Sequence, residues 1–346
     1  MGRDPVTGAR EGRMADPGLT DRFGREHRDL RISLTDRCSL RCTYCMPAEG
    51  VPWLKSDTML STDELVRVAR VAVEMGVEEI RLTGGEPLLR ADVVDVVDRL
   101  ASLEGPAGRP ELSLTTNALR LPALAAPLRD AGLARVNISL DTLQRDRFHE
   151  LTRRDRLTDT LAGIAAADAA GLSPIKINAV AMRGTNDDEI VDLTRFCVDR
   201  GYQMRFIEQM PLDAGHTWDR HEMVTGEEIL AALASHWTLT ERPGRGAAPA
   251  QVWDVDGGPA SVGVIASVTR PFCGTCDRVR LTADGQLRAC LFARQESDIR
   301  SLLRDGADDA ALAGAIAACL RLKQPGHDID DPSFLQPDRP MSAIGG

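Results

Sequence analysis

Residues 36–47 read DRCSLRCTYCMP and place three thiols, Cys38, Cys42 and Cys45, in a Cys-x3-Cys-x2-Cys spacing. Thiolates bind iron–sulfur clusters, and a cubane cluster contains four iron atoms. Three ligands leave one iron open, and an open metal position is where chemistry can occur. The alternative is half of a structural zinc site, which needs four Cys or His ligands. Because no histidine follows nearby and the next cysteine is Cys197, the spacing favours a cluster.

The composition narrows the class of protein. The chain has 346 residues, of which 43% are hydrophobic, enough to fill the core of one large domain or two smaller ones. Its net charge of −10 argues against a nucleic-acid-binding surface, which is normally basic. No apolar run approaches the ~18 residues of a membrane helix, and no export signal follows the N-terminal charges. We therefore expect a cytoplasmic protein with no membrane partner, in which the eight cysteines are metal ligands or buried thiols, with disulfides as the weaker alternative.

From residue 30 onwards, short aliphatic segments alternate with longer amphipathic ones, as in strand–helix repeats. The predicted strands cover residues 30–34, 79–82, 112–116, 136–140, 175–180 and 204–207. Helices are predicted after the capping box Ser61-x-x-Glu64 and over residues 92–103, 121–131, 158–170 and 187–199. Six such repeats imply an α/β fold, a partial (β/α)6 TIM-like barrel with a parallel sheet and helices outside it.

Three parts of the chain follow from this pattern. Residues 1–25 are predicted to be a flexible leader, 26–215 the partial barrel, and 216–346 a smaller C-terminal region. In that region, short strands are expected at 262–269 and 279–282 and a helix at 309–323. Chemistry in such barrels lies at the C-terminal ends of the strands. We therefore expect one shared site from residues that follow strand ends: Cys38, the 83–87 turn, Thr115, Ser139 and Met210.

The turn Thr83-Gly84-Gly85-Glu86-Pro87 follows a predicted strand and alone would indicate only a loop. Together with the first cysteine triad it resembles the GGEP motif of the radical S-adenosylmethionine (SAM) superfamily. That resemblance implies that the open iron of a [4Fe-4S] cluster binds SAM and that the cluster cleaves it to a 5′-deoxyadenosyl radical. It also implies that the glycines admit a ligand close to the backbone and that Glu86 contacts the amino group of SAM.

A second cysteine triad, Cys273-x2-Cys276-x13-Cys290, lies in the C-terminal region. A zinc site is a more serious alternative here, with Cys319 as a fourth ligand. Beside the triad, Arg278 and Arg280 alternate on a short predicted strand and so point to one face. Guanidinium groups suit a phosphate ligand, so this pattern favours a cluster that anchors a substrate. Cys197 and Cys319 lie in predicted helices and are expected to be core residues.

From about Arg28 to Gly346, the chain resembles the GTP 3′,8-cyclase family of molybdenum-cofactor biosynthesis. The resemblance rests on both triads, GGEP, the motif CxxCxRxRLTxDGxLxxCL and the terminal Gly345-Gly346. It implies that Cys38, Cys42 and Cys45 hold the SAM cluster and that Cys273, Cys276 and Cys290 hold a second [4Fe-4S] cluster, whose open iron binds guanine. The implied SAM contacts are Tyr44, Gly85, Glu86, Ser139 and Met210. The implied GTP contacts are Arg31, Arg81, Thr115, Lys176, Arg278, Val279 (through its backbone only) and Arg280. Arg31, Gly345 and Gly346 would also belong to the catalytic machinery, with the tail reaching into the active site.

The implied reaction is a radical cyclisation. The deoxyadenosyl radical removes a hydrogen atom from C3′ of GTP, the C3′ radical attacks C8, and reduction gives (8S)-3′,8-cyclo-7,8-dihydroguanosine 5′-triphosphate. The implied partners are GTP, SAM, an external electron donor and a downstream cyclic pyranopterin monophosphate synthase, and the family resemblance allows a homodimer.

Three other functions are weighed against this one. A peptide-modifying radical SAM enzyme or sulfatase activator would carry a longer, cysteine-rich C-terminal region. A non-catalytic zinc or cluster protein gives no reason for GGEP. An electron-transfer ferredoxin-like protein would have full cysteine ligation, and neither triad has a fourth cysteine in its motif.

Overall fold

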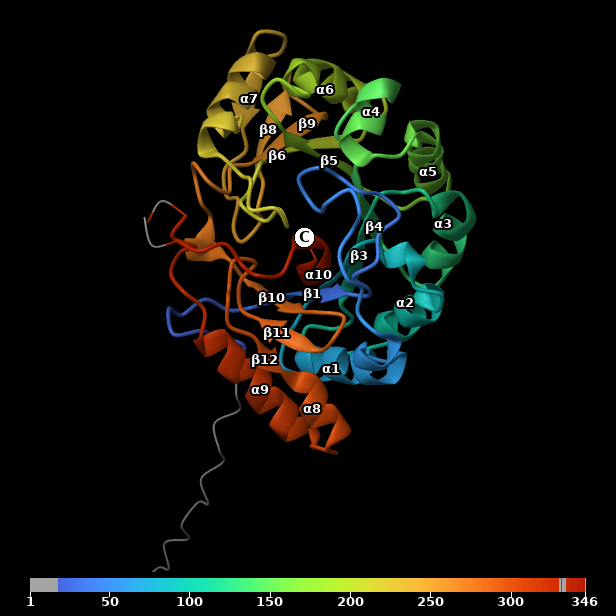
Figure 1. Cartoon of the computed structure of the whole chain (residues 1–346), viewed down its shortest axis with the longest axis vertical. Helices are drawn as coiled ribbons and strands as arrows, with labels where there is room; N and C mark the ends of the chain where they lie inside the picture. The colour runs from blue at the N-terminus through green and yellow to red at the C-terminus, as the bar shows by residue number, and fades with distance from the viewer. Residues whose placement is uncertain (1–17, 330, 332–333, 346) are drawn as a thin grey trace, which may run out of the picture.

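A computed structural model describes residues 18–329, 331 and 334–345, and within these residues twelve strands form one curved sheet (Figure 1). Its centre consists of parallel strands in chain order: β1 (Asp29–Ser33), β2 (Glu79–Thr83), β3 (Glu111–Thr116), β4 (Arg135–Ser139), β5 (Ile175–Ala181) and β6 (Gln203–Glu208). Each of the six strands predicted for the barrel is confirmed, with its ends shifted by one residue or less. The partial α/β barrel predicted from the repeats is therefore confirmed.

Helices cover the convex face of this sheet (Figure 1). They are α1 (Thr62–Glu74), α2 (Val93–Ala101), α3 (Leu121–Asp130), α4 (Arg145–Thr152), α5 (Leu157–Ala169) and α6 (Ile190–Val198). The α1 helix begins at the predicted capping box, where Ser61 and Glu64 each accept a hydrogen bond from the other's backbone N–H. Its apolar side, which includes Leu65 and Val68, is buried against the strands. The concave face of the sheet is left for polar side chains and the site.

The C-terminal region extends both edges of the same sheet. At one edge β9 (Ser261–Ile265) pairs in parallel with β6, followed by antiparallel β8 (Gln251–Val255) and β7 (Leu239–Glu241). At the other, β10 (Arg278–Leu281) pairs in parallel with β1, followed by antiparallel β11 (Gln286–Arg288) and β12 (Ser297–Asp298). The remaining helices are α7 (Gly226–Ala234), α8 (Ile299–Arg304), α9 (Asp309–Arg321) and α10 (Met341–Ile344). Within the described residues, none of the helices is both long and apolar enough to cross a membrane.

The ends of the predicted helices are shifted by up to three residues, and two larger differences from the prediction remain. The strand expected over 262–269 ends at Ile265, because the buried Glu208 carboxylate accepts the backbone N–H groups of Val268 and Thr269. The predicted flexible leader is wrong for residues 18–25, which are packed: Leu19 is buried, and the Asp21 carboxylate accepts two backbone N–H groups of its own turn. Residues 1–17 of that leader lie outside the described part of the chain.

Candidate active site

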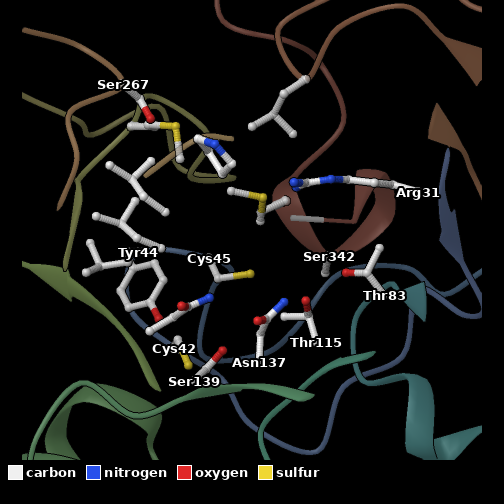
Figure 2. Close-up of a pocket in the computed structure, with 18 of the residues that line it drawn as sticks. Arg31, Cys42, Tyr44, Cys45, Thr83, Thr115, Asn137, Ser139, Ser267 and Ser342 are labelled. Carbon is white, nitrogen blue, oxygen red and sulfur yellow. The ribbon is translucent and has the colours of Figure 1, made fainter. Parts of the chain in front are cut away.

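Both cysteine triads face one cavity of about 310 Å³ on the concave side of the sheet. Figure 2 shows Cys42 and Cys45 of the first triad in this cavity. All six thiols line it: Cys38, Cys42, Cys45, Cys273, Cys276 and Cys290. The first triad follows β1, at the C-terminal end of the parallel strands. Cys276 precedes β10 and Cys290 follows the antiparallel β11, so the second triad lies at the opposite end and the cavity extends between the two. The eight cysteines are free, and the other two, Cys197 and Cys319, are buried in the core as predicted.

The thiols of neither triad are arranged around a single ion. Within the described residues, no group of three or more His, Cys, Asp or Glu side chains is placed to hold one metal ion. A zinc ion would need its ligands around one centre, whereas each thiolate of a cubane binds a different iron atom. Burial raises the pKa of Cys38 to about 11 and that of Cys45 to about 12, so cluster binding must release their protons. The donor sets therefore fit clusters better than zinc.

The GGEP turn holds the loop that carries the first triad. Gly85 N–H donates to the Thr35 carbonyl (2.8 Å), and Glu86 N–H donates to the Arg37 carbonyl (2.7 Å). A Cβ at Gly84 would lie 2.3 Å from the Thr35 oxygen, and one at Gly85 would lie 2.4 Å from that of Arg37. These glycines therefore admit the loop before Cys38. Gly85 also lines the cavity, and the predicted approach of a ligand to this backbone stays a prediction.

Glu86 lies in the cavity wall and is 1% exposed. Its Oε1 accepts Thr116 Oγ1 (2.7 Å) and Leu88 N–H (3.0 Å), while Oε2 accepts the Asn117 N–H (2.8 Å). Burial raises the pKa of Glu86 to about 6, against the effect of these donors. The carboxylate thus joins the GGEP turn to the end of β3, and Oε2 keeps one lone pair for a ligand.

Tyr44 ties the first triad to the opposite strands. Its hydroxyl donates to Asp141 Oδ2 (2.8 Å), and Asp141 Oδ1 accepts the N–H of Val180 in β5 (2.9 Å). Figure 2 shows Tyr44 beside Cys42, Cys45 and Ser139 in the same part of the cavity. Ser139 and Met210 also line it, so the five residues predicted to contact SAM lie together.

The second triad lies where β10 begins. Cys273 starts a short 3-10 turn (Cys273–Thr275), and Cys276 follows it. Cys276 Sγ accepts from Arg278 Nη1 (3.4 Å) and from Lys323 Nζ (3.4 Å). Burial alone would raise the pKa of Cys276, but these two cations lower it below its usual value. The second triad therefore has a sulfur atom in direct contact with two cationic side chains.

Buried cations crowd the floor of the barrel. Burial, and then repulsion from Arg81, lowers the pKa of Arg31 to about 9. Burial, and then repulsion from Arg205, lowers the pKa of Lys176 to about 7. Burial, and then repulsion from Arg31, lowers the pKa of Arg280. Such mutual repulsion is relieved by a bound polyanion, so this floor is suited to a phosphate ligand.

Several buried polar atoms in this interior have no hydrogen-bond partner within the described residues: Asn137 Oδ1, Asn178 Oδ1, Arg31 Nε and Arg278 Nε. A bound ligand can satisfy such groups. Asn137, Asn178 and Arg205 also line the cavity, and the sequence analysis missed them. Their positions in the sequence could have revealed them. Each lies in a predicted strand, on the side that alternation directs toward the interior of the barrel.

Most, but not all, of the residues predicted to contact GTP line the cavity. Arg31, Arg81, Thr115, Arg278 and Arg280 line the cavity, whereas Lys176 is not among its lining residues. The Val279 side chain is 1% exposed and packs in the hydrophobic core, so only its backbone is left for a ligand, as expected.

The C-terminal tail returns to the cavity. The Gly345 carbonyl accepts a hydrogen bond from Arg280, and the Ile344 carbonyl accepts one from Ser33 Oγ (2.9 Å). Ser342 lines the cavity. Thr83, at the end of the neighbouring strand β2, lies beside Ser342 (Figure 2). Gly346 lies outside the described residues.

Comparison with known proteins agrees with this geometry. Residues 32–197 match the model of the Radical SAM superfamily, and residues 202–329 match that of Molybdenum Cofactor Synthesis C. The GTP 3′,8-cyclase of Streptomyces coelicolor is 56% identical over 331 residues, which cover 95% of this chain and 96% of that protein. This chain belongs to the GTP 3′,8-cyclase family. A second member, GTP 3′,8-cyclase 2 of Mycobacterium tuberculosis, is 53% identical and covers 99% of this chain and 98% of its own.

The chain also shares its fold with more distant proteins. Streptococcus suis SuiB, in a structure bound to S-adenosylmethionine, superposes with a TM-score of 0.56 over 84% of this chain and 68% of its own. Sequence identity is 15%, so this likeness concerns the fold alone.

Proposed function

We infer that this chain is a radical SAM GTP 3′,8-cyclase that converts GTP to (8S)-3′,8-cyclo-7,8-dihydroguanosine 5′-triphosphate, the first step of molybdenum-cofactor biosynthesis. The observation that carries this inference is the meeting of two three-cysteine groups and a set of buried cations in one cavity. Each triad would leave one iron of a cubane open, and the buried cations supply the positive charge that a triphosphate needs.

The first triad would hold the SAM cluster through Cys38, Cys42 and Cys45. When bound, the cluster and SAM supply the 5′-deoxyadenosyl radical that takes hydrogen from C3′ of GTP. The protein's own part is to hold the loop, through Tyr44 and the GGEP turn, and to offer Glu86 Oε2 to the SAM amino group. Ser139 and Met210 would complete the pocket for SAM.

The second triad would hold a further [4Fe-4S] cluster through Cys273, Cys276 and Cys290, with its open iron directed to guanine. Arg278 and Arg280 both lie in β10 and line the cavity beside this triad. Arg31 and Arg81 would bind the triphosphate, with Arg205 and Lys176 adding charge from β6 and β5. Thr115, Asn137 and Asn178 would provide neutral hydrogen bonds to the nucleoside.

The atoms of the reaction balance. One hydrogen atom leaves C3′ for the deoxyadenosyl radical, a C3′–C8 bond forms, and one electron and one proton complete the product, which is therefore an isomer of GTP. Because both SAM cleavage and the last step consume an electron, an external electron donor is required. The product would pass to cyclic pyranopterin monophosphate synthase, and a homodimer stays a prediction.

An anaerobic turnover assay tests this function. Protein reconstituted with iron and sulfide receives SAM, GTP and dithionite, and chromatography with mass spectrometry follows 5′-deoxyadenosine and a GTP isomer. We expect both products from the wild type, neither from Cys38→Ala, and deoxyadenosine with little isomer from Arg280→Ala. SAM cleavage without any GTP isomer in the wild type would keep the superfamily and contradict the cyclase.

A further inference from the structure

A buried ammonium group lies beside the second triad and has no part in the proposed reaction. Lys323 follows α9 and is 3% exposed. Its Nζ donates to the Arg278 carbonyl (2.7 Å) and to Cys276 Sγ (3.4 Å), and it lies 3.4 Å from His27 Nδ1. The three hydrogens of an ammonium therefore have three acceptors, one of which is a cysteine of the triad.

The N-terminal segment fixes the third of these acceptors. His27 is fully buried, and its Nε2 lies 3.1 Å from Asp21 Oδ2. A carboxylate only accepts, so Nε2 carries the proton and Nδ1 presents its lone pair to Lys323. Burial, and then the charge of Lys323, lowers the pKa of His27 to about 4, so the ring is neutral at pH 7. Asp21 and His27 thus hold the lysine in one orientation.

The same segment also fixes the backbone of the triad. Arg25 Nη1 donates to the Cys273 carbonyl (2.6 Å), and Nη2 donates to the Gln324 carbonyl next to Lys323 (2.8 Å). Arg25 is held in turn by Asp21, which its Nε contacts at 2.6 Å. One buried carboxylate therefore supports two connections to the second triad, one to a backbone carbonyl and one to a sulfur atom.

We propose that Lys323 is a positioning residue for the second iron–sulfur cluster, and that its hydrogen bond to Cys276 raises the reduction potential of that cluster. The proposal rests on the proposed function, which places a cluster on this triad. A cationic donor to a ligand sulfur withdraws electron density and stabilises the reduced cluster, and buried donors act most strongly. Asp21, His27 and Arg25 are the shell that holds the donor.

The test isolates the second cluster in the full-length chain. Cys38→Ala, Cys42→Ala and Cys45→Ala together remove the first cluster site, and anaerobic reconstitution should leave about four iron atoms per chain. Redox titration followed by electron paramagnetic resonance then gives the midpoint potential, which is measured again after Lys323→Met, Lys323→Arg and Lys55→Met. Lys55 is exposed and serves as the matched control.

We expect Lys323→Met to move the midpoint potential to a more negative value with the iron content retained, Lys323→Arg to restore most of it, and Lys55→Met to leave it unchanged. If Lys323→Met loses its iron, Lys323→Gln keeps a donor without the charge and should show a smaller negative shift. Full iron with an unchanged potential in both neutral variants would overturn the proposal. Absence of iron from the background chain itself would instead contradict the second cluster of the proposed function.

Discussion

Tyr44 and Asp141 connect the first cysteine triad to the barrel. The Tyr44 hydroxyl and the Val180 N–H both donate to the Asp141 carboxylate, which burial holds at a pKa of about 6. The phenol therefore does two things: its ring lines the SAM side of the cavity, and its hydroxyl fixes the loop between Cys42 and Cys45. Removing only the hydroxyl separates these roles.

Tyr44→Phe should destabilise the fold by about 1–3 kcal/mol, because it leaves a buried carboxylate oxygen without its donor. It should also weaken SAM binding to the reconstituted protein, since the loop is less fixed. Urea unfolding and equilibrium dialysis with SAM measure the two effects. Tyr202→Phe is the matched control, because Tyr202 donates to Asp168 (3.1 Å) away from the cavity. Equal SAM affinity in both variants would contradict the positioning role of Tyr44.

Lys176 should make GTP binding depend on pH. Its pKa of about 7 in the free protein must rise when a polyanion binds, because the anion stabilises the charged form. GTP binding should therefore take up a proton near pH 7, and this part of the affinity is fully present below pH 7 and lost as pH rises through the pKa of the complex. Calorimetry in buffers of different ionisation enthalpy measures the uptake.

Lys176→Met should reduce this proton uptake relative to the wild type by up to about one proton per GTP. Comparing the two proteins removes the contribution of the phosphate groups of GTP itself. Lys55→Met, which changes an exposed lysine, should behave as the wild type does. The same uptake in Lys176→Met and the wild type would show that Lys176 does not titrate on binding.

At the scale of the elements, the repeats were predictable because their periodicity is strong. Each parallel strand is a short apolar run, and each helix between them has one buried side. The α4 helix (Arg145–Thr152) was missed because it is mostly polar and buries only Phe148, Leu151 and Thr152. The strands β7, β11 and β12 are two or three residues long, so pairing rather than sequence pattern defines them.

The α5 helix depends on a glycine at its closest approach to the β3–α3 loop. A Cβ at Gly163 would lie 2.1 Å from the Ala118 carbonyl oxygen, whereas one at Gly314 in α9 would meet nothing within 4 Å. Gly163→Ala should destabilise the protein by about 1–3 kcal/mol through overpacking. Gly314→Ala should stabilise it by about 0.5–1 kcal/mol, the usual helix preference for alanine. Urea unfolding of both variants measures this, and equal stabilities would contradict the packing described for α5.

At the scale of the molecule, residues 18–28 and 339–345 both pack near β1 and β10. The N-terminal segment packs beside the second triad, and the tail crosses the cavity to reach Ser33 and Arg280. Arg339 anchors the tail on the way, with two hydrogen bonds to the Asp284 carboxylate (3.0 and 2.9 Å). The sequence predicted the triads and the tail as motifs. It could not predict these contacts, because they join residues about 55 to 311 positions apart.

The tail should accept no side chain at Gly345. Its φ is +79°, and a Cβ there would lie 2.3 Å from Ser33 Oγ. Gly345→Ala should displace the tail and lower the rate of cyclisation at least tenfold, about 1.4 kcal/mol, with little change in the unfolding midpoint. Gly314→Ala is the control, with an unchanged rate of cyclisation. Wild-type turnover by Gly345→Ala, or by a chain without Gly345 and Gly346, would contradict a role for the tail.

If one cavity brings a SAM-derived radical to C3′ of GTP, an isotope at C3′ must be transferred to 5′-deoxyadenosine. GTP carrying deuterium at C3′ is incubated with the reconstituted protein, SAM and dithionite, and mass spectrometry follows 5′-deoxyadenosine. We expect one deuterium in the deoxyadenosine and the appearance of a GTP isomer. Deoxyadenosine without deuterium, formed while GTP is converted, would contradict this transfer.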